Sequence, residues 1–581
     1  MAKSRLLFPS LLAGAALALA AGLPAFAQRA ADAAAPAPAS AKAAVAPHAM
    51  VAAANPLAAR AGLKVLRAGG GAVDAAVAIQ AVLGLVEPQS SGLGGGAFMI
   101  YYDAKARTAI AYDGREVAPA GARPDMFLGP DGKPLSFAQA VVSGRATGVP
   151  GAIAMLRLAH REHGRLAWKD LFGDAQQLAS DGFTVSPRLA NYLSLTFYPQ
   201  ASQPDVLAYF TKPDGTKYKT GDVLKNPAYA ATLRRVAAEG PDALLKGQVA
   251  ADIVARTHAD PLPGTMTLAD LAGYRPRKAE ALCRPYRTYL VCTPPLPSGG
   301  PALQELLGIL ENTDIAAHGP GDPQGWYLFA EASRLMYADR DYFHGDPAAV
   351  SVPLGGLLAP GYLKARAALI GPAAAKAVDH GTPQGALALG PDRTAEPGGT
   401  SSFAIMDDRG DVLIMTTTVE SLFGTGRMVD GFFLNNQLTD FSFAPTAPDG
   451  TAAANAVGPG KRPRSSMVPT LVLDRDGRFV LGVGSPGGSS ILAYVGKALV
   501  GAIDWKLPLP DAIALPNLIA RGETTTPESS FDATLADALK AKGETLAPAR
   551  GEESGLHGLQ AVPGGVLGAA DPRREGIAVG F

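Results

Sequence analysis

Blocks of hydrophobic and polar residues in the first hundred positions predict two helices and then a strand. The first helix is expected to begin at Asn55 and Pro56, a good N-cap followed by proline in the first turn, and to end at glycines 69–71. Residues 72–86 are almost continuously apolar, which is typical of a helix buried on all sides. Residues 97–102 then predict a strand.

Residues after about position 400 change to short runs separated by tight turns. Residues 402–407 and 412–418 flank an Asp-Arg-Gly-Asp turn, and residues 470–473 and 479–483 flank an Asp-Arg-Asp-Gly turn. Two hairpins of this kind predict an antiparallel sheet.

The remaining elements are mainly helical. Residues 151–291 are expected to be mostly helices with polar loops, and further helices are expected over 302–310, 326–342 and 490–503. Residues 354–397 are rich in Ala, Gly and Pro and predict loops. Strands between helical layers indicate an α+β fold in which sheets are sandwiched by helices.

Composition narrows the possible classes of protein. The chain has 581 residues, which suggests either several domains or one large layered domain. Hydrophobic residues make up 48% and charged residues 18%, as in a globular protein with a large core. Lys+Arg and Asp+Glu are both 52, so the formal net charge is zero. The basic excess typical of proteins that bind nucleic acid or membrane surfaces is therefore missing.

The N-terminus has the pattern of a signal peptide. Lys3 and Arg5 precede an apolar stretch over residues 6–23, and Ala-Phe-Ala at 25–27 is a small-x-small cleavage site. We therefore expect residues 1–27 to be removed and the protein to be periplasmic or secreted; a retained membrane anchor is the alternative. Residues 28–46 are almost all Ala and Pro and predict a linker that need not fold.

The two cysteines, Cys283 and Cys292, are candidates for a disulfide in an exported protein. The stretch between them fits either a tight hairpin or a single strand. A hairpin would allow the bond, whereas opposite ends of one extended strand would lie too far apart.

A self-cleaving nucleophile fits the sequence Gly398-Gly399-Thr400 at the start of a predicted strand. The Thr400 hydroxyl could attack the carbonyl of Gly399, where glycine leaves room for the attack. The freed α-amino group would have a pKa near neutrality and could serve as the base for its own hydroxyl. Because Gly-Gly-Thr before a strand is common, the pattern alone favours an ordinary turn.

Short motifs throughout the chain change this balance. In order they are residues 69–76 (GGGAVDAA), 87–92 (EPQSSG), 113–116 (DGRE), 148–151 (GVPG), 294–300 (PPLPSGG), 331–346, 398–400 (GGT), 434–437 (LNNQ), 454–459 (ANAVGP), 461–470, 484–489 (GSPGGS) and 570–574 (ADPRR). Over residues 49–581 this series resembles the gamma-glutamyltransferase family. Any one motif could arise by chance, but so many in the family's order are hard to explain otherwise.

The resemblance implies a four-layer αββα sandwich of the N-terminal-nucleophile hydrolase type. It also implies autocatalytic cleavage between Gly399 and Thr400. The products would be a large subunit, residues 47–399, and a small catalytic subunit, residues 400–581, which stay together as a heterodimer. The family's enzymes form a gamma-glutamyl ester on the nucleophile and pass the acyl group to water, an amino acid or a dipeptide.

The resemblance also implies the catalytic residues. Thr400 would be the nucleophile, Thr418 would orient its amino group, and the amides of Gly487 and Gly488 would form the oxyanion hole, a role that suits glycine-flanked amides. Taken alone, Gly487 and Gly488 could equally be packing glycines.

Five further residues would hold the glutamyl group. Arg115 would grip the α-carboxylate, Ser465 and Ser466 would add hydrogen bonds to it, and Gln437 and Asp440 would receive the α-amino group. Taken alone, Arg115 could be an ordinary ion pair, the two serines a turn and Asp440 a loop cap.

Two features depart from the family's pattern. Residue 420, which is often Asn in the bacterial enzymes, is Glu420 here; its carboxylate could strengthen amine binding, repel the substrate carboxylate or disturb Thr400. The segment between Asp440 and Asn455 is shorter than in family members that have a lid over the pocket, and it contains no Tyr. We therefore expect an open pocket that admits large acceptors or mainly water.

The leading hypothesis is an enzyme that acts on glutathione and related gamma-glutamyl amides. A cephalosporin or glutaryl acylase with the same chemistry is one rival, although Asp440 would have no amine to pair with in a glutaryl substrate. A processed but inactive binding protein is another, although the intact nucleophile argues against it. Histidines are few and scattered, so no metal site is expected, and acyl transfer needs no cofactor.

Overall fold

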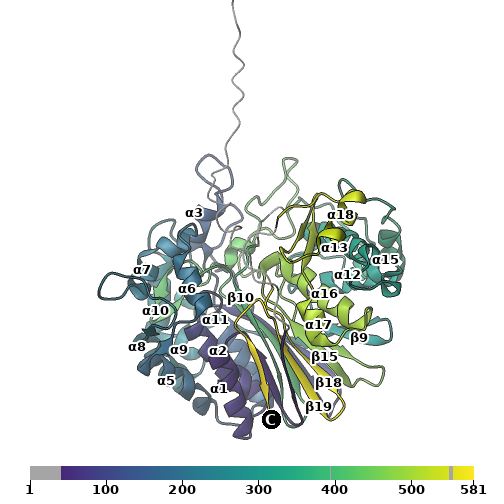
Figure 1. The fold of residues 1–581 in the computed structure, drawn as a ribbon. Coiled ribbons are helices and arrows are strands. Elements are labelled where there is room, and N and C mark those ends of the chain that lie inside the picture. Colours follow the sequence, from purple (N-terminus) through teal and green to yellow (C-terminus); the bar gives the residue numbers. More distant parts are fainter. Residues whose placement is uncertain (1–40, 393, 395, 549–553) are drawn as a thin grey trace, which may run out of the picture. The chain divides into compact units, whose positions relative to one another are not determined.

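Two seven-stranded antiparallel sheets lie face to face between layers of helices (Figure 1). The computed structural model describes residues 41–392, 394, 396–548 and 554–581, and these belong to one compact unit, Pro38–Phe581. The four-layer arrangement confirms the αββα sandwich. The proposed signal peptide lies outside the described residues.

The two sheets draw their strands from both halves of the chain. The first has the order β20-β2-β10-β11-β3-β4-β7, with bounds Ile577–Gly580, Met50–Ala53, Thr400–Met406, Val412–Thr418, Gly96–Asp103, Thr108–Asp113 and Arg277–Glu280. The second has the order β1-β19-β18-β15-β14-β9-β8, with bounds Lys42–Ala46, Gly565–Ala570, His557–Val562, Phe479–Gly484, Thr470–Leu473, Tyr289–Thr293 and Leu282–Tyr286. The two predicted hairpins therefore form, but in different sheets: β10 pairs with β11, and β14 with β15.

Helices cover the outer face of each sheet. On the side of the first sheet lie α1 (Pro56–Arg67), α2 (Ala72–Val86), α4 (Ala152–His163), α5 (Gly173–Asp181) and α8 (Pro227–Glu239). On the side of the second lie α12 (Gly300–Glu311), α13 (Pro323–Phe343), α16 (Ile491–Ile503) and α17 (Leu509–Ala514). The predicted start of α1 is confirmed, because the Asn55 side chain accepts a hydrogen bond from Leu57 N at 2.9 Å. Every residue of α2 is buried, as its apolar sequence predicted.

Alternation along β10 sends its side chains to two different cores. Phe403 and Ile405 join the core beneath the helices, whereas Ala404 joins the core between the sheets. Because side chains alternate with a period of two, Thr400 and Ser402 share the inter-sheet face with Ala404. The first residue of this strand is therefore aimed into the space between the sheets.

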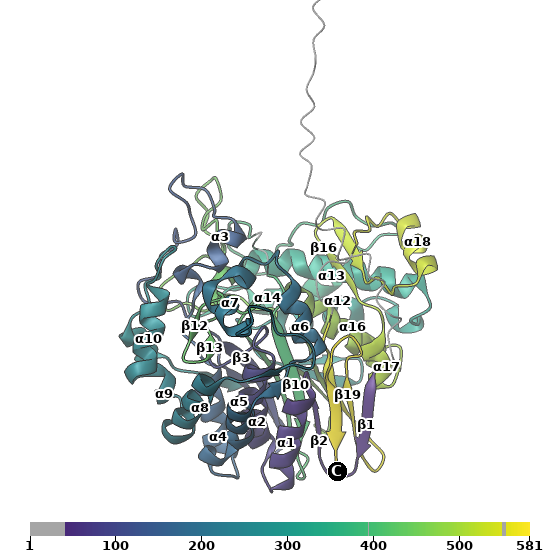
Figure 2. The same cartoon turned by 60° about the vertical axis from the view of Figure 1, so that its left-hand side comes forward.

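Three sequence expectations need correction. The Ala/Pro-rich linker was expected to extend to residue 46, but Lys42–Ala46 forms β1, an edge strand whose backbone pairs with β19 (Figure 2). The region 151–291, expected to be mainly helical, ends in strands because residues 277–286 complete the edges of both sheets. The loop-rich region 354–397 contains two short helices, Leu354–Leu357 and Pro360–Ala367.

The cysteines lie on a hairpin, which was one of the two alternatives left open by the sequence. Cys283 on β8 is directly opposite Cys292 on β9, and the two form a disulfide. The bond cross-links β8 and β9, the two outermost strands at one edge of the second sheet.

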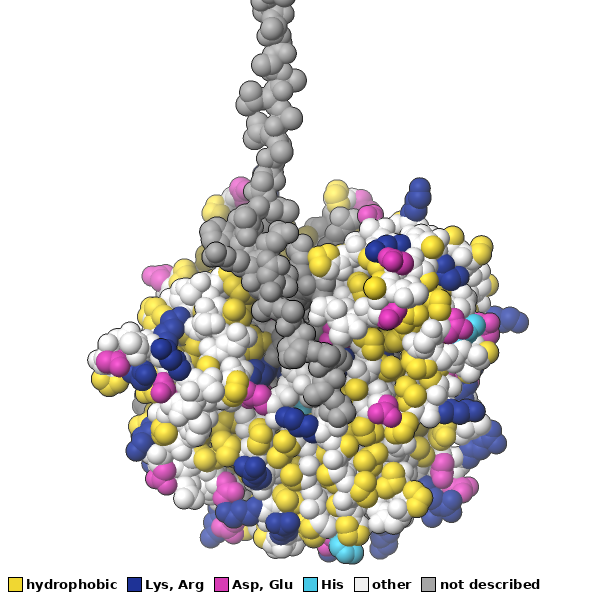
Figure 3. Space-filling view, viewed as in Figure 1, with side chains coloured by type: hydrophobic (Ala, Val, Ile, Leu, Met, Phe, Trp, Pro, Cys, Tyr) yellow, Lys and Arg dark blue, Asp and Glu magenta, His cyan; other side chains and the backbone are white. Residues whose placement is uncertain are grey.

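Within the described residues, every helix is too short or too polar to span a bilayer. On the face shown in Figure 3, Lys and Arg side chains are interspersed with Asp and Glu. This mixture agrees with the zero formal net charge of the chain.

Candidate active site

Thr400 begins β10 and lies directly opposite Thr418, the last residue of β11. Both side chains face the space between the sheets, and both residues are buried, with exposed fractions of 4% and 2%. The two hydroxyls are 3.3 Å apart. The predicted nucleophile and its predicted partner are thus brought together by the register of one hairpin.

A chain of hydrogen bonds joins the Thr400 hydroxyl to the carbonyl that precedes it. Thr400 Oγ1 donates to Thr418 Oγ1, and Thr418 Oγ1 donates to the Gly399 carbonyl oxygen at 2.9 Å. The backbone N–H of Glu420 donates to Thr418 Oγ1 at 2.7 Å and fixes its position. The Thr418 hydroxyl can therefore polarise the Gly399 carbonyl while it accepts a hydrogen bond from the attacking group.

Close backbone contacts explain why glycine precedes Thr400. A Cβ atom on Gly399 would lie 2.3 Å from the Glu420 carbonyl oxygen and 2.6 Å from the Cα of Ser421. No side chain fits between these backbone atoms, so only glycine allows this close approach to the segment that follows β11.

Gly487 and Gly488 form a sharp turn before α16. Their φ angles are +136° and +56°, in the region that favours glycine. A Cβ on Gly488 would lie 2.3 Å from the carbonyl oxygen of Glu396 and 2.5 Å from that of Pro397, so the turn packs against the segment upstream of Thr400. Within the described part of the chain, neither glycine N–H has a hydrogen-bond partner. Both amides are free to stabilise a developing oxyanion.

Arg115 lies in a buried cluster with two other residues predicted to bind substrate. Arg115 Nη2 is 2.5 Å from Asp440 Oδ2, and its guanidinium also donates to the backbone carbonyls of Pro463 and Arg464. Gln437 Nε2 donates to the same Asp440 oxygen at 2.6 Å. The cluster places a cation and an anion side by side, as recognition of an amino acid head group requires.

Glu420, the residue that departs from the family's pattern, places a further carboxyl in this pocket. It is buried, its φ is +83°, and its Oε2 accepts a hydrogen bond from Asn436 Nδ2. Burial, and then the nearby Asp440 carboxylate, raise the pKa of Glu420 well above its usual value. Among the described residues Asp440 has Arg115 as a counterion and Glu420 is paired with no cation, so of the two carboxyls Glu420 is the one that holds its proton more tightly.

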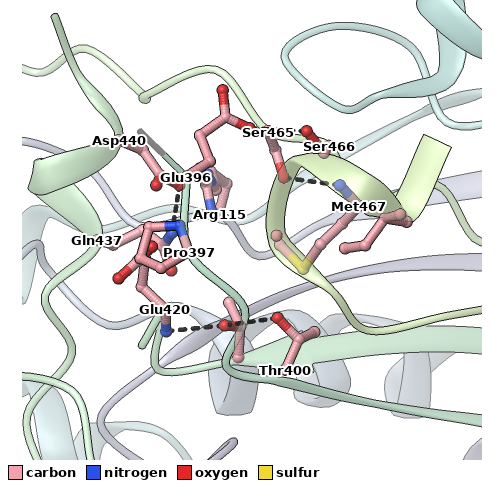
Figure 4. A pocket seen from close by; sticks show the side chains of 13 residues that line it. Arg115, Glu396, Pro397, Thr400, Glu420, Gln437, Asp440, Ser465, Ser466 and Met467 are labelled. Carbon is pink, nitrogen blue, oxygen red and sulfur yellow. Dashed lines mark hydrogen bonds and ion pairs between the residues drawn. The ribbon is translucent and has the colours of Figure 1, made fainter. Parts of the chain in front are cut away.

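Ser465 and Ser466 lie on the opposite side of the pocket from Thr400 and Glu420 (Figure 4). Ser465 Oγ accepts a hydrogen bond from Met467 N at 3.1 Å. Ser466 Oγ donates to Glu396 Oε2 at 2.7 Å.

Sequence reasoning missed four charged residues around these groups. Arg340 and Arg464 both bind the carboxylate of Glu396, and Arg574 Nη1 donates to the Thr400 carbonyl oxygen at 3.1 Å. All but Glu396 fall inside motifs already recognised, 331–346, 461–470 and 570–574, but their partners lie in distant segments. Glu396 directly precedes Pro-Gly-Gly-Thr, and this neighbourhood was the one available signal.

The pocket is nearly full in the uncut chain. Its cavity is about 20 Å³, room for about one water molecule, and its walls include Glu396 and Pro397. All the predicted site residues line it except Gly487 and Gly399, which lie next to its walls: Arg115, Thr400, Thr418, Glu420, Gln437, Asp440, Ser465, Ser466 and Gly488. The geometry gathers these residues, while their individual roles stay predictions.

Comparisons with known proteins agree with this geometry. The family model described as gamma-glutamyltranspeptidase matches residues 58–581. The chain belongs to the gamma-glutamyltranspeptidase family.

Individual members of this family and its relatives resemble the chain over most of its length. It is 36% identical over 549 residues to the glutathione hydrolase proenzyme of Bacillus subtilis, covering 92% of this chain and 91% of that one. It is 35% identical over 535 residues to the Escherichia coli glutathione hydrolase proenzyme, covering 90% of each. The solved cephalosporin acylase from Bacillus halodurans superposes with a TM-score of 0.81 at 25% identity, covering 94% of this chain and 98% of that one.

The short segment after Asp440 stays away from the pocket of this gamma-glutamyltranspeptidase family member. Phe443 stacks on Phe127 with ring centroids 4.6 Å apart, in a small apolar cluster that includes Phe441. Among the described residues that line the cavity, none comes from positions 441–456. The expectation of an open pocket in the processed enzyme remains a prediction.

Proposed function

We propose that the protein is a gamma-glutamyl hydrolase and transferase that acts on glutathione and related gamma-glutamyl amides. The reaction proceeds through a gamma-glutamyl ester on Thr400, after autocatalytic cleavage between Gly399 and Thr400. The observation that carries the proposal is the hydrogen-bonded path from the Thr400 hydroxyl through Thr418 to the Gly399 carbonyl.

Self-cleavage follows from this path. Thr400 Oγ attacks the Gly399 carbonyl carbon, and the developing negative charge on the carbonyl oxygen is stabilised by the Thr418 hydroxyl. The proton of the Thr400 hydroxyl passes to the amide nitrogen, and the C–N bond breaks as the acyl group moves from nitrogen to oxygen. Water then hydrolyses the ester, which leaves a carboxylate on Gly399, a free hydroxyl on Thr400 and a new α-amino group on Thr400.

The new amino group supplies the base for the second reaction. With a pKa near neutrality it can take the proton of the Thr400 hydroxyl during attack on the substrate amide. The amides of Gly487 and Gly488, which donate to no acceptor among the described residues, hold the oxyanion of the tetrahedral intermediate. Protonation of the leaving amine yields the acyl-enzyme, which water, an amino acid or a dipeptide then resolves.

The glutamyl head group is bound at the end of the pocket opposite Thr400. Arg115, Ser465 and Ser466 bind the α-carboxylate, and Asp440 with Gln437 binds the α-ammonium group. A neutral Glu420 next to Asp440 adds a hydrogen-bonding group without a second negative charge, so amine recognition does not require both carboxyls to ionise.

An acylase with the same chemistry is the alternative, because a cephalosporin acylase structure is similar over nearly the whole chain. The two functions differ at one group: a gamma-glutamyl substrate carries an α-ammonium group for Asp440, and a glutaryl substrate does not. An inactive binding protein is a third reading, which failure to self-cleave would favour.

The same proposal covers processing and location. A signal peptide, residues 1–27, directs the chain to the periplasm or outside the cell, and residues from 28 lead into the large subunit, which ends at Gly399. The small subunit runs from Thr400 to Phe581 and remains bound to it.

Intact mass and a denaturing gel of the purified protein test the central claim. The wild type should give two fragments that divide between Gly399 and Thr400, Thr400→Ala should stay whole, and Ser401→Ala should still be cut. The processed wild type should then hydrolyse a gamma-glutamyl anilide in preference to a glutaryl anilide. A wild-type chain that folds but stays uncut would refute the proposal. A preference for the glutaryl anilide would favour the acylase.

A further inference from the structure

The carboxylate of Glu396 sits among groups assigned to substrate recognition. Oε2 accepts hydrogen bonds from Ser466 Oγ at 2.7 Å and from Arg340 Nη2 at 2.8 Å. Oε1 accepts from Arg464 through Nη2 at 3.0 Å and Nε at 3.3 Å. Glu396 is buried, so all four hydrogen bonds are shielded from water.

Glu396 also fixes the backbone four residues before the nucleophile. Its carbonyl oxygen accepts a hydrogen bond from Ser489 N at 3.2 Å, next to the Gly487-Gly488 turn. On the other side of the scissile bond, Thr400 is held by the pairing of β10 with β11. The short Pro-Gly-Gly connection is therefore fixed at both ends, which restricts the approach of the Thr400 hydroxyl to the Gly399 carbonyl.

Glu396 and a bound substrate would compete for Ser466. The Ser466 hydroxyl has one proton to donate, and Glu396 receives it. A substrate α-carboxylate would also place a second anion beside the first, inside a cavity of about 20 Å³.

We propose that Glu396 is a positioning residue for self-cleavage that also occupies the carboxylate end of the pocket until the chain is cut. Its carboxylate anchors the segment that carries Gly399 and keeps substrate from Ser466 in the precursor. After cleavage the segment is tied to β10 no longer, and it can withdraw and vacate Ser466. This inference rests on the proposed function, because it assumes that Thr400 cuts the chain.

The charge state of Glu396 supports the anchor. Burial alone would raise the pKa of this carboxyl, but Arg340 and Arg464 outweigh burial and hold the pKa well below its usual range. The carboxylate therefore stays ionised throughout the pH range in which the protein would be assayed.

Cleavage kinetics of freshly synthesised precursor test the anchoring role. Glu396→Gln keeps the shape but loses the charge, and loss of a buried charged hydrogen bond corresponds to a cleavage rate about tenfold to a hundredfold lower. Glu396→Asp restores the charge and should recover part of the rate. Asp392→Asn is the matched control, because Asp392 also binds Arg464 Nη2, at 3.1 Å, while no hydrogen bond or ion pair within the described part of the chain joins it to Ser466 or Arg340. Its cleavage rate should stay within about threefold of wild type.

Ligand binding tests the blocking role in chains that cannot cut themselves. L-glutamate should not bind Thr400→Ala in calorimetry and should bind Thr400→Ala/Glu396→Ala. Equal binding to both proteins, or to neither, would show that Glu396 does not close the pocket. Thermal unfolding in the same Thr400→Ala background separates loss of folding from loss of positioning, and Glu396→Asp serves if the glutamine variant does not fold.

The two proposals fail in different ways. If Glu396→Gln cuts itself as fast as the wild type, the anchoring role is overturned and the proposed function stays intact. An uncut wild-type chain would overturn the proposed function itself.

Discussion

Replacement of Thr418 by valine removes one hydroxyl and keeps the shape of the side chain. In the structure this hydroxyl donates to the Gly399 carbonyl at 2.9 Å and accepts from Thr400 Oγ1 and Glu420 N. Thr418→Val therefore takes away the donor that faces the oxygen on which charge develops, and it also leaves the buried N–H of Glu420 without its partner.

The size of the effect follows from these contacts. Loss of one oxyanion donor typically raises an activation barrier by about 2.7–4 kcal/mol, so self-cleavage should slow by about a hundredfold to a thousandfold. The unpaired N–H should cost roughly 1–3 kcal/mol of folding stability. Thr418→Ser keeps the hydroxyl and loses only a methyl group, so its cleavage rate should stay within about tenfold of wild type.

A time course of cell-free synthesis, resolved on denaturing gels, gives the cleavage rate of each variant. The melting temperature of Thr400→Ala/Thr418→Val, compared with that of Thr400→Ala, gives the stability cost separately. A folded Thr418→Val protein that is cut as fast as the wild type would refute the assignment of Thr418 to the scissile carbonyl.

Two further changes test the substrate site and its surroundings. Asp440→Asn should raise the KM for a gamma-glutamyl anilide by about tenfold to a hundredfold, because a charged partner of the α-ammonium group is lost, while hydrolysis of a glutaryl anilide, which lacks that group, should change little. Glu116 is fully buried and neither of its carboxyl oxygens has a hydrogen-bond partner among the described residues; burial raises its pKa from 4.5 to about 8. The folded chain thus holds this proton more tightly than the unfolded chain, so the stability associated with it is complete below about pH 4.5 and is lost as the pH rises through about 8. In the Thr400→Ala background, Glu116→Gln should gain roughly 4 kcal/mol relative to the parent between about pH 4.5 and pH 9, measured by chemical unfolding, and a difference that is constant with pH would contradict the raised pKa.

Local sequence patterns predicted individual elements better than their arrangement. The apolar run of α2 and the hairpin turn between β10 and β11 are local signals, and both elements lie where expected. The sheet to which each hairpin belongs could not be predicted, because alternation is the same in either sheet. β1 was missed because its five residues, KAAVA, contrast little with the Ala/Pro-rich stretch before them, and its strand form comes from backbone pairing with β19.

The candidate site shows the same limit. The motifs supplied Thr400, Arg115 and Asp440, since each has a recognisable neighbourhood in the sequence. Contacts between segments were beyond the sequence: Glu396 with Arg340 and Arg464 joins three regions, and each residue alone resembles an ordinary surface charge. The coupling of Glu420 to Asp440 likewise depends on burial, which no local pattern specifies.

Strands from the two sides of Gly399 are interleaved in both sheets. In the first sheet β10 and β11 lie between β2 and β3, and in the second β19, β18, β15 and β14 lie between β1 and β9. One cut therefore leaves the native fold in place but changes the route back to it. An uncut chain refolds as a single molecule, whereas the separated fragments must first meet, so recovery from denaturant becomes dependent on protein concentration. The stability of the cleaved enzyme is therefore kinetic: it is set by the rate of unfolding rather than by a reversible folding equilibrium.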